Sequence, residues 1–581
     1  MSSDSIWSLI TGWTSRCVQG DPKHFRCYRD VHFVSSGVPS RLIDVRSGEL
    51  SDQIRLTVSP TEREPRPYMT LSYHWGPNVK QSELHLLRKS SLEQYKRQIP
   101  ISHLPRLFQD VVEVARKLDI RYLWIDAYCI IQGDAVDWEK EAARMGEIYQ
   151  HAILNIAAGG APDTNASLMV ERNTALVEPS KVIVDWRDLA KKVGRPPESW
   201  YPAGSYYVFD ALYIEGQMLE TPLNHRAWVM QEQQLSSRIL HFGKHQLFWH
   251  CWGDHGYSHQ ACETLPKGTP TNVLGFSRAH PYVLQTLVPS NWGEDPAMFL
   301  HLLWHRLVMS YSRCGITRET DRLIAISGLA RRFAEILPES ARYDGQLYAA
   351  GIWLRSLSWS LCWHVDINPL SLSPRSYRYS NFVAPSWSWA SVKGHIKLHD
   401  SITYRDLLSN GMEFFALADS FQINMEHVMP ENPFGQVKSG QISLSGYIIP
   451  AENLIWFWNK REDRERGQGQ NCRTCGLFPL FTFLHCNFDD CKDYESRKRK
   501  WVCLPYFFKA PGIDLLPLVY WKHPSQKRES FCEGIMVVRD VASNVYRRIG
   551  YFSSNDSTLK FAGNPEHIVI YMKELTKVIL V

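Results

Sequence analysis

The chain has 581 residues, 44% of them hydrophobic and 22% charged, which is enough to bury a large core over about two to four domains. Its formal net charge of +5 is small for this length and gives no support for nucleic-acid binding. The start lacks a basic segment followed by an apolar one, and no run approaches the roughly 18 apolar residues of a membrane helix. We therefore expect a cytoplasmic protein without a membrane span.

Residues 1–65 form an N-terminal segment of short apolar runs broken by Gly and Pro, and a core domain begins at residue 66. In this domain, 66–260, short β-rich runs alternate with helical periodicity. The pattern predicts a strand, a helix and two buried strands, at 68–73, 107–118, 121–131 and 152–158. This order indicates an α/β fold with a mainly parallel sheet, in which the three strands are adjacent at the centre.

Residues 137–150 predict a helix between the last two of these strands, with Trp138, Met145 and Tyr149 on one apolar side. Glu141 lies on that same side, whereas the other charged residues spread over the opposite side. A carboxylate among apolar neighbours must find partners or accept a raised pKa, which makes it a candidate for function. The alternative is that Glu141 reaches the edge of the stripe or pairs with an arginine.

Polar residues gather where the strand 121–131 meets this helix. Ligands of open α/β sheets bind beyond the carboxyl ends of the strands. We therefore expect several polar side chains to crowd one rim with Glu141, namely Asp126, Gln132, Asp134 and Asp137. Asp134 or Asp137 can instead be the N-cap of the helix.

Further along the chain, residues 181–223 look like an insertion, and a helix follows Pro222. The runs SRILHF and HQLFWHC around Gly243 and Lys244 predict a hairpin. Residues 261–382 are a helical region that includes a helix over YAAGIWLRSLSWSLCW, and residues 383–581 are a β-rich C-terminal region with strands at SWSWASV and GIMVVRD.

Three blocks resemble the signature blocks of the fungal heterokaryon incompatibility (HET) domain, in the right order. They are YMTLSYHWG (68–76), LWIDAYCIIQGDAVDWEKEAARMGEIYQHAILNIAA (123–158) and HRAWVMQEQQLSSRILHFGKHQLFWHC (225–251). The runs 311–330, APSWSWASVKG and VYRRIGYF resemble extensions that follow this domain. The resemblance implies a role in non-self recognition and programmed cell death, and a remote kinship with the TIR fold, a flavodoxin-like α/β fold whose catalytic members cleave NAD.

The kinship with TIR domains implies a catalytic glutamate shortly after a tryptophan. Glu141 follows Trp138 by three residues, and Glu232 follows Trp228 by the four residues found in many TIR domains. NAD is then a candidate substrate rather than a permanently bound cofactor. The residues expected to bind it are Tyr73, Trp75, Asp126, Gln132, Trp138, Arg226 and Gln231, with core packing as the alternative for each aromatic residue.

The resemblance leaves two functions open. One is a cell-death effector that binds and hydrolyses NAD, and the other is a non-enzymatic adaptor that acts by oligomerisation through protein contacts. A degenerate copy without activity is a third alternative. We expect an incompatibility partner that the sequence does not identify, a candidate homo-oligomer, and no nucleic-acid partner.

The 13 cysteines, scattered along the chain, favour reduced and buried thiols over a disulfide framework. Four of them have a spacing that allows zinc but favours loop thiols, namely Cys472, Cys475, Cys486 and Cys491. Cys129 is expected to be a buried thiol and not a nucleophile. The basic run SRKRK reads as a solvated loop or a nuclear signal. No P-loop motif occurs.

Overall fold

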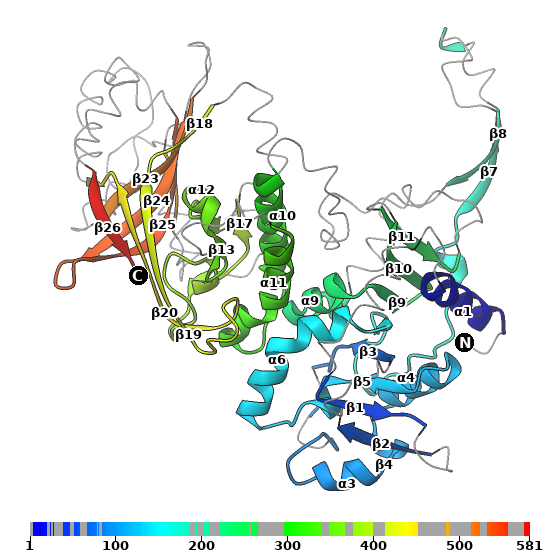
Figure 1. Cartoon of the computed structure of the whole chain (residues 1–581). Helices are drawn as coiled ribbons and strands as arrows, with labels where there is room; N and C mark the ends of the chain where they lie inside the picture. Colours follow the sequence, from blue (N-terminus) through cyan, green and yellow to red (C-terminus); the bar gives the residue numbers. More distant parts are fainter. Residues whose placement is uncertain are drawn as a thin grey trace, which may run out of the picture. The chain divides into compact units, whose positions relative to one another are not determined.

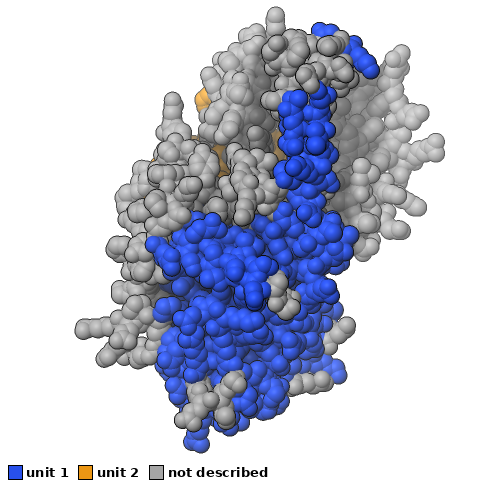
Figure 2. All heavy atoms as spheres, turned by 90° about the vertical axis from the view of Figure 1, so that its right-hand side faces the viewer, with its two compact units in different colours: residues 1–288 blue, residues 289–581 orange. Residues whose placement is uncertain are grey.

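The computed structural model divides into two compact units, residues 1–288 and 289–581 (Figure 2). It describes residues 4–19, 24, 27, 39–46, 52–58, 67–77, 79–80, 84–185, 192–194, 203–208, 221–254, 257–264, 296–337, 348–365, 376–398, 413–450, 484–488, 513–522, 531–555 and 575–581. No helix in these ranges has both the length and the apolar character that crossing a membrane requires.

The centre of the first unit is a parallel sheet of four strands (Figure 1). In spatial order they are β9 (Arg238–Phe242), β6 (Leu154–Ala157), β3 (Tyr68–Ser72) and β5 (Tyr122–Trp124). All residues of β3, β6 and β9 are buried, as expected for strands covered on both faces. The α/β fold and the adjacency of the three predicted strands are confirmed.

Antiparallel strands complete this sheet at both edges. On the β5 side lie β1 (Arg41–Asp44), β2 (Gln53–Val58) and β4 (Ile99–Pro100), and on the β9 side lie β10 (Leu247–Asp254) and β11 (Tyr257–Cys262). The β9–β10 pair is the predicted hairpin. Strands β1 and β2 come from the N-terminal segment, so residues 41–44 and 53–58 share a sheet with the region that follows residue 66.

The sequence predicts one strand over residues 121–131, but the structure divides this buried run into two elements. It ends as β5 at Trp124 and continues as a helical turn, α5 (Asp126–Cys129). The Asp126 carboxylate accepts the N–H of Ala127 at 2.7 Å, and the Asp126 carbonyl accepts the N–H of Ile130 at 2.9 Å. A continuous apolar run suits a buried helix as well as a buried strand, which is why periodicity alone predicts it wrongly.

The helices of the first unit are α1 (Asp4–Val18), α3 (Leu92–Arg97), α4 (Arg106–Lys117), α6 (Ala135–Gln150) and α9 (Ala227–Leu235). Three of them, α4, α6 and α9, lie where the sequence predicts them, whereas α1 and α3 were not predicted. The insertion contains a hairpin of β7 (Ser180–Val184) and β8 (Gly204–Val208), which projects away from the sheet (Figure 1).

The second unit combines helices with a nine-stranded sheet that is antiparallel except for one pair. The helices are α10 (Pro296–Tyr311), α11 (Ser327–Ile336) and the short α12 (Leu357–Ser360). The strands are β18 (Glu413–Ala416), β19 (Asp419–His427), β20 (Val437–Gly446), β21 (Ile449–Pro450), β22 (Leu484–Phe488), β23 (Ile513–Lys522), β24 (Phe531–Asp540), β25 (Val545–Asn555) and β26 (Thr576–Leu580). The β-rich C-terminal region is confirmed.

Two local predictions in the second unit are wrong. The run YAAGIWLRSLSWSLCW begins with the short strands β12 (Tyr348–Ala349) and β13 (Ile352–Trp353), because Ala350 and Gly351 turn the backbone at φ values of 39° and 98°. The run SWSWASV forms a 3₁₀ turn over Trp389–Ser391 and the short strand Val392–Lys393. Both runs are buried because their tryptophans fill the core.

Candidate functional site

Two predicted site residues meet at the carboxyl ends of neighbouring strands. Tyr73 directly follows β3, and Asp126 lies just beyond β5. The Tyr73 hydroxyl donates a hydrogen bond of 2.6 Å to Asp126 Oδ1. Burial raises the pKa of Asp126, against the lowering effects of this hydrogen bond and of the Arg226 charge. Tyr73 and Asp126 are therefore joined at this end of the sheet, and the wider rim that includes Glu141 stays a prediction.

Arg226 covers this pair from the residue that precedes α9. Its guanidinium lies 5.8 Å from the centroid of the Tyr73 ring and donates a hydrogen bond to the Tyr73 carbonyl oxygen. Its positive charge lowers the pKa of Asp126 and of Glu232. Arg226 is thus the cation shared by the two carboxyl groups.

Glu232, on α9, is the second carboxyl group of this cluster and is 5% exposed. Burial raises its pKa to about 7, although Arg226 and the hydroxyls of Ser72 and Tyr149 act in the opposite direction. Its Oε2 atom is buried without a hydrogen-bond partner among the described residues. A buried carboxyl group with one unsatisfied oxygen and a pKa near neutrality is typical of functional sites.

We call the set of Ser72, Tyr73, Asp126, Tyr149, Arg226 and Glu232 the carboxylate cluster. Ser72 and Tyr149 were not among the predicted site residues. The Tyr149 hydroxyl donates to the Leu71 carbonyl at 3.0 Å, and the charge of Glu232 raises the pKa of Tyr149, which burial has already raised. In the sequence Tyr149 reads as one more apolar residue of the helical stripe. The hydroxyl of a buried tyrosine needs a hydrogen-bond partner, and this requirement is the one feature of the sequence that could have indicated a polar site at Tyr149.

Glu141 is fully buried on α6, as its position in the apolar stripe predicts. Its Oε1 atom accepts a 2.5 Å hydrogen bond from the Ser40 hydroxyl and lies 3.9 Å from Arg144 Nη1. Its Oε2 atom has no hydrogen-bond partner among the described residues. The contacts of Glu141 thus tie α6 to the segment before β1, and its place in one NAD site with Arg226 and Gln231 stays a prediction.

The other predicted residues have contacts of a more structural kind. Trp75 packs edge-on against Tyr73 at 5.1 Å, and Trp138 packs edge-on against Trp228 at 6.3 Å, joining α6 to α9. Gln132 donates to the carbonyls of Asp126 and Ile130. Gln231 is buried.

The two flanking aspartates have structural partners. Asp134 is the N-cap of α6 and accepts the N–H of Val136 at 3.2 Å. Asp137 pairs with Arg41 at 2.6 Å and accepts the N–H of Ile131. The capping alternative is therefore confirmed for Asp134, and Asp137 connects α6 to β1.

The described cysteines agree with the prediction of reduced thiols. Eight are free and seven of these are buried. Burial raises the pKa of Cys129 to about 12, which opposes a role as a nucleophile. Of the predicted zinc alternative, Cys472, Cys475 and Cys491 lie outside the described residues, as does the side chain of Cys486, and so does the run SRKRK.

One comparison with known proteins gives a match. Residues 68–232 match the family model described as heterokaryon incompatibility protein (HET). No curated protein and no solved structure matches the chain. The matched range begins at the first residue of β3 and ends at Glu232, so it contains every member of the carboxylate cluster.

Proposed function

Because the chain carries a HET domain over residues 68–232, which indicates a function related to heterokaryon incompatibility, we propose that it is an effector of this response that cleaves NAD at the carboxylate cluster. Programmed cell death then follows from the loss of NAD in the fused cell. The residues of the carboxylate cluster would then perform the NAD cleavage that the resemblance to TIR domains implies.

The observation that carries the proposal is the state of Glu232. It combines burial, a pKa near 7, an unsatisfied oxygen and a cationic neighbour, Arg226, at the carboxyl edge of a parallel sheet. Ligands of such sheets bind at this edge. Glu141 follows its tryptophan by three residues rather than the four found in many TIR domains, and a serine and an arginine hold its Oε1 atom. We therefore assign the chemistry to Glu232 and a positioning role to Glu141.

The chemistry needs only one carboxylate. Hydrolysis of an ordinary glycoside requires an acid because the leaving oxygen must be protonated. Nicotinamide leaves NAD as a neutral molecule from a cationic one, so the leaving group needs no proton, and water adds to the ribose carbon and releases one proton to the solvent. The ionised form of Glu232 would stabilise the positive charge that develops on the ribose, in a poorly hydrated environment where this interaction is strong. With a pKa of about 7, roughly half of Glu232 is ionised at neutral pH.

Access sets a condition on the proposal. Glu232 is 5% exposed and the neighbouring Tyr73 is 2% exposed. A dinucleotide can reach them only if side chains around α9 move when it binds. Trp228 lies one helical turn before Glu232 on α9, and its half-buried ring packs against Trp138 of α6.

A second function, that of a non-enzymatic adaptor, is favoured by the β7–β8 hairpin. This projecting hairpin exposes large apolar side chains, with Ile183 at 85%, Val208 at 56% and Tyr207 at 48%. Exposed apolar residues of this size on a two-stranded hairpin suit a protein contact. In this alternative the carboxylate cluster is a structural network, and toxicity follows from oligomerisation.

Incubation of the purified full chain with NAD distinguishes the two functions. Free nicotinamide is followed by chromatography, with the chain alone and with the chain fused to a domain that forces oligomers. Nicotinamide release that is lost in Glu232→Gln supports the enzyme. Absence of release under both conditions, with a death phenotype in a fungal host that depends on Ile183 and Tyr207, overturns it and supports the adaptor.

A further inference from the structure

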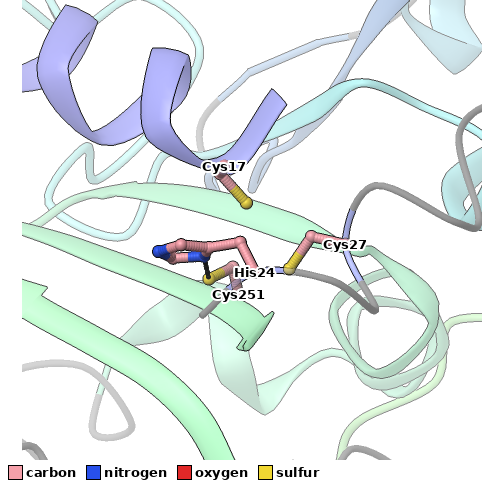
Figure 3. A group of neighbouring side chains, drawn as sticks. All are labelled: Cys17, His24, Cys27 and Cys251. Carbon is pink, nitrogen blue, oxygen red and sulfur yellow. Dashed lines mark hydrogen bonds between the residues drawn. The ribbon is translucent and has the colours of Figure 1, made fainter. Parts of the chain in front are cut away.

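Four potential metal ligands from distant parts of the chain meet beside the edge of the first sheet (Figure 3). We call them the Cys–His group: Cys17, His24, Cys27 and Cys251. Cys17 lies at the end of α1, His24 and Cys27 follow it, and Cys251 lies in β10, 227 residues after His24. All four residues lie outside the HET match.

The geometry of the Cys–His group is that of a closed four-ligand site. The four ligand atoms lie within 4.8 Å of one another, and Cys251 Sγ is 3.3 Å from His24 Nδ1. A tetrahedral zinc ion with Zn–S bonds of about 2.3 Å places its sulfur ligands about 3.8 Å apart. The atoms therefore need to move by less than about 1 Å to surround an ion of this kind.

The burial of the Cys–His group argues against a chance cluster of surface side chains. Three of its members are 0% exposed and His24 is 4% exposed. Figure 3 shows the side chains of α1, of the segment after it and of β10 converging on one point. Three thiols and an imidazole select zinc over the hard ions magnesium and calcium, and four protein ligands leave no open position for a substrate.

A buried arginine supplies an independent observation. Arg238, in β9, is 1% exposed and lies opposite Cys251 in the sheet register. Its Nε atom donates to Cys17 Sγ at 3.1 Å, and its other nitrogens donate to the carbonyls of Ile153 and Cys27. No carboxylate pairs with Arg238 in the part of the chain that the structure describes.

A metal ion resolves the charge balance around Arg238. An unpaired buried guanidinium is costly. A zinc ion with three thiolates and a neutral imidazole carries one net negative charge, which Arg238 neutralises. The N–H···S hydrogen bond to Cys17 is then an outer-shell contact that orients the ligand.

We propose that Cys17, His24, Cys27 and Cys251 bind one structural zinc ion that fastens the N-terminal helix to β10. The ion closes a loop that contains the whole HET match, and it acts beside an apolar contact in which the Trp13 and Trp249 rings lie 6.2 Å apart. It is independent of the proposed NAD cleavage.

Metal analysis of the full chain, purified without chelator, tests the proposal. We expect about one zinc per chain, and a value near zero in Cys17→Ser and in Cys251→Ser, since each loses one of four ligands. Cys129→Ser removes an equally buried thiol outside the group and should keep the zinc. Replacing Cys472, Cys475, Cys486 and Cys491 together by serine should also leave the stoichiometry unchanged.

A second measurement covers variants that fail to fold. Chelator-treated wild-type chain reloaded with Co²⁺ should show the absorption bands of a tetrahedral thiolate site, and His24→Cys, which keeps four ligands, should bind Co²⁺ with a shifted spectrum. Chelation should lower the melting temperature by at least about 5 °C. Zinc that survives Cys17→Ser and Cys251→Ser, zinc lost only with the four distal cysteines, or a disulfide within the group overturns the proposal.

Discussion

The two compact units each place an arginine over an aromatic ring, but the groups around its charge differ. In the second unit Arg548 is 0% exposed, lies 3.5 Å over the Trp363 ring, and donates to the carbonyls of Leu361 and Trp363. In the first unit Arg226 lies over Tyr73 and shares its charge between Asp126 and Glu232.

The difference separates a structural site from a candidate active site. Two backbone carbonyls accept hydrogen bonds from the fully buried Arg548 guanidinium, and the Trp363 ring lies against it. The carboxylate cluster keeps one oxygen of Glu232 unsatisfied and a pKa near neutrality. An arginine over an aromatic ring is thus common to both units, and in the first unit this arginine acts on two buried carboxyl groups.

The largest effect is expected from Glu232→Gln, which keeps the shape of the side chain and removes its charge. Removal of one such electrostatic group typically lowers the rate by about 10² to 10³. We expect this loss in nicotinamide release, followed by chromatography, with thermal stability close to that of the wild type. A rate of nicotinamide release within a few-fold of the wild type would contradict a catalytic role for Glu232 and indicate that the carboxylate cluster is structural.

Arg548→Met should destabilise the second unit by about 3 kcal/mol, because it removes hydrogen bonds from a charged donor to two buried carbonyls and the contact with Trp363. The free energy of unfolding is measured with denaturant. The control is Arg539→Met in β24, which removes an exposed guanidinium that bonds to Asn544 and should cost much less. Equal costs for the two variants would contradict the structural role of Arg548.

The raised pKa of Glu232 predicts a pH dependence of stability. Between its usual value of 4.5 and about 7, the folded chain holds a proton on Glu232 that the unfolded chain releases. Stability is therefore highest at the acid end of this range and falls as the pH rises to 7, by roughly 2 kcal/mol between pH 5 and pH 7. The difference in unfolding free energy between wild type and Glu232→Gln isolates this term from other groups. If this difference in unfolding free energy does not change between pH 5 and pH 7, the pKa of Glu232 is not raised by folding.

Much of the fold could be predicted because periodicity reports burial. Strands β3 and β6 and helices α4, α6 and α9 all lie where apolar spacing predicts them. The part of the first sheet formed by β1 and β2 could not be predicted in this way, since short strands joined across the chain leave no local signal of their partner. The same limit applies to the Trp-rich turns of the second unit, where buried tryptophans occur outside regular elements.

The candidate site was only partly predictable. Tyr73, Asp126, Arg226 and Glu232 were all candidates, but their common location depends on the packing of α9 over β3 and could not be read from spacing. The Cys–His group was missed because Cys251 is far in sequence from Cys17 and Cys27, although His24 and Cys27 have the short spacing of zinc ligands. The four distal cysteines, in contrast, lie close together in the sequence, so their spacing alone indicates a candidate zinc site.

Glu141→Gln should have the smallest effect and decides between the two glutamates. The variant keeps a hydrogen-bond acceptor for the Ser40 hydroxyl and loses only the negative charge beside Arg144. We therefore expect the free energy of unfolding to fall by about 1 kcal/mol or less and the cleavage rate to stay within a few-fold of the wild type. Ser40→Ala, which removes the donor, should have a similarly small effect on the rate. If instead Glu141→Gln abolishes nicotinamide release and the death phenotype while Glu232→Gln retains both, the catalytic carboxylate is that of Glu141. Full toxicity in both variants would leave neither buried carboxylate with a chemical role and would favour the adaptor.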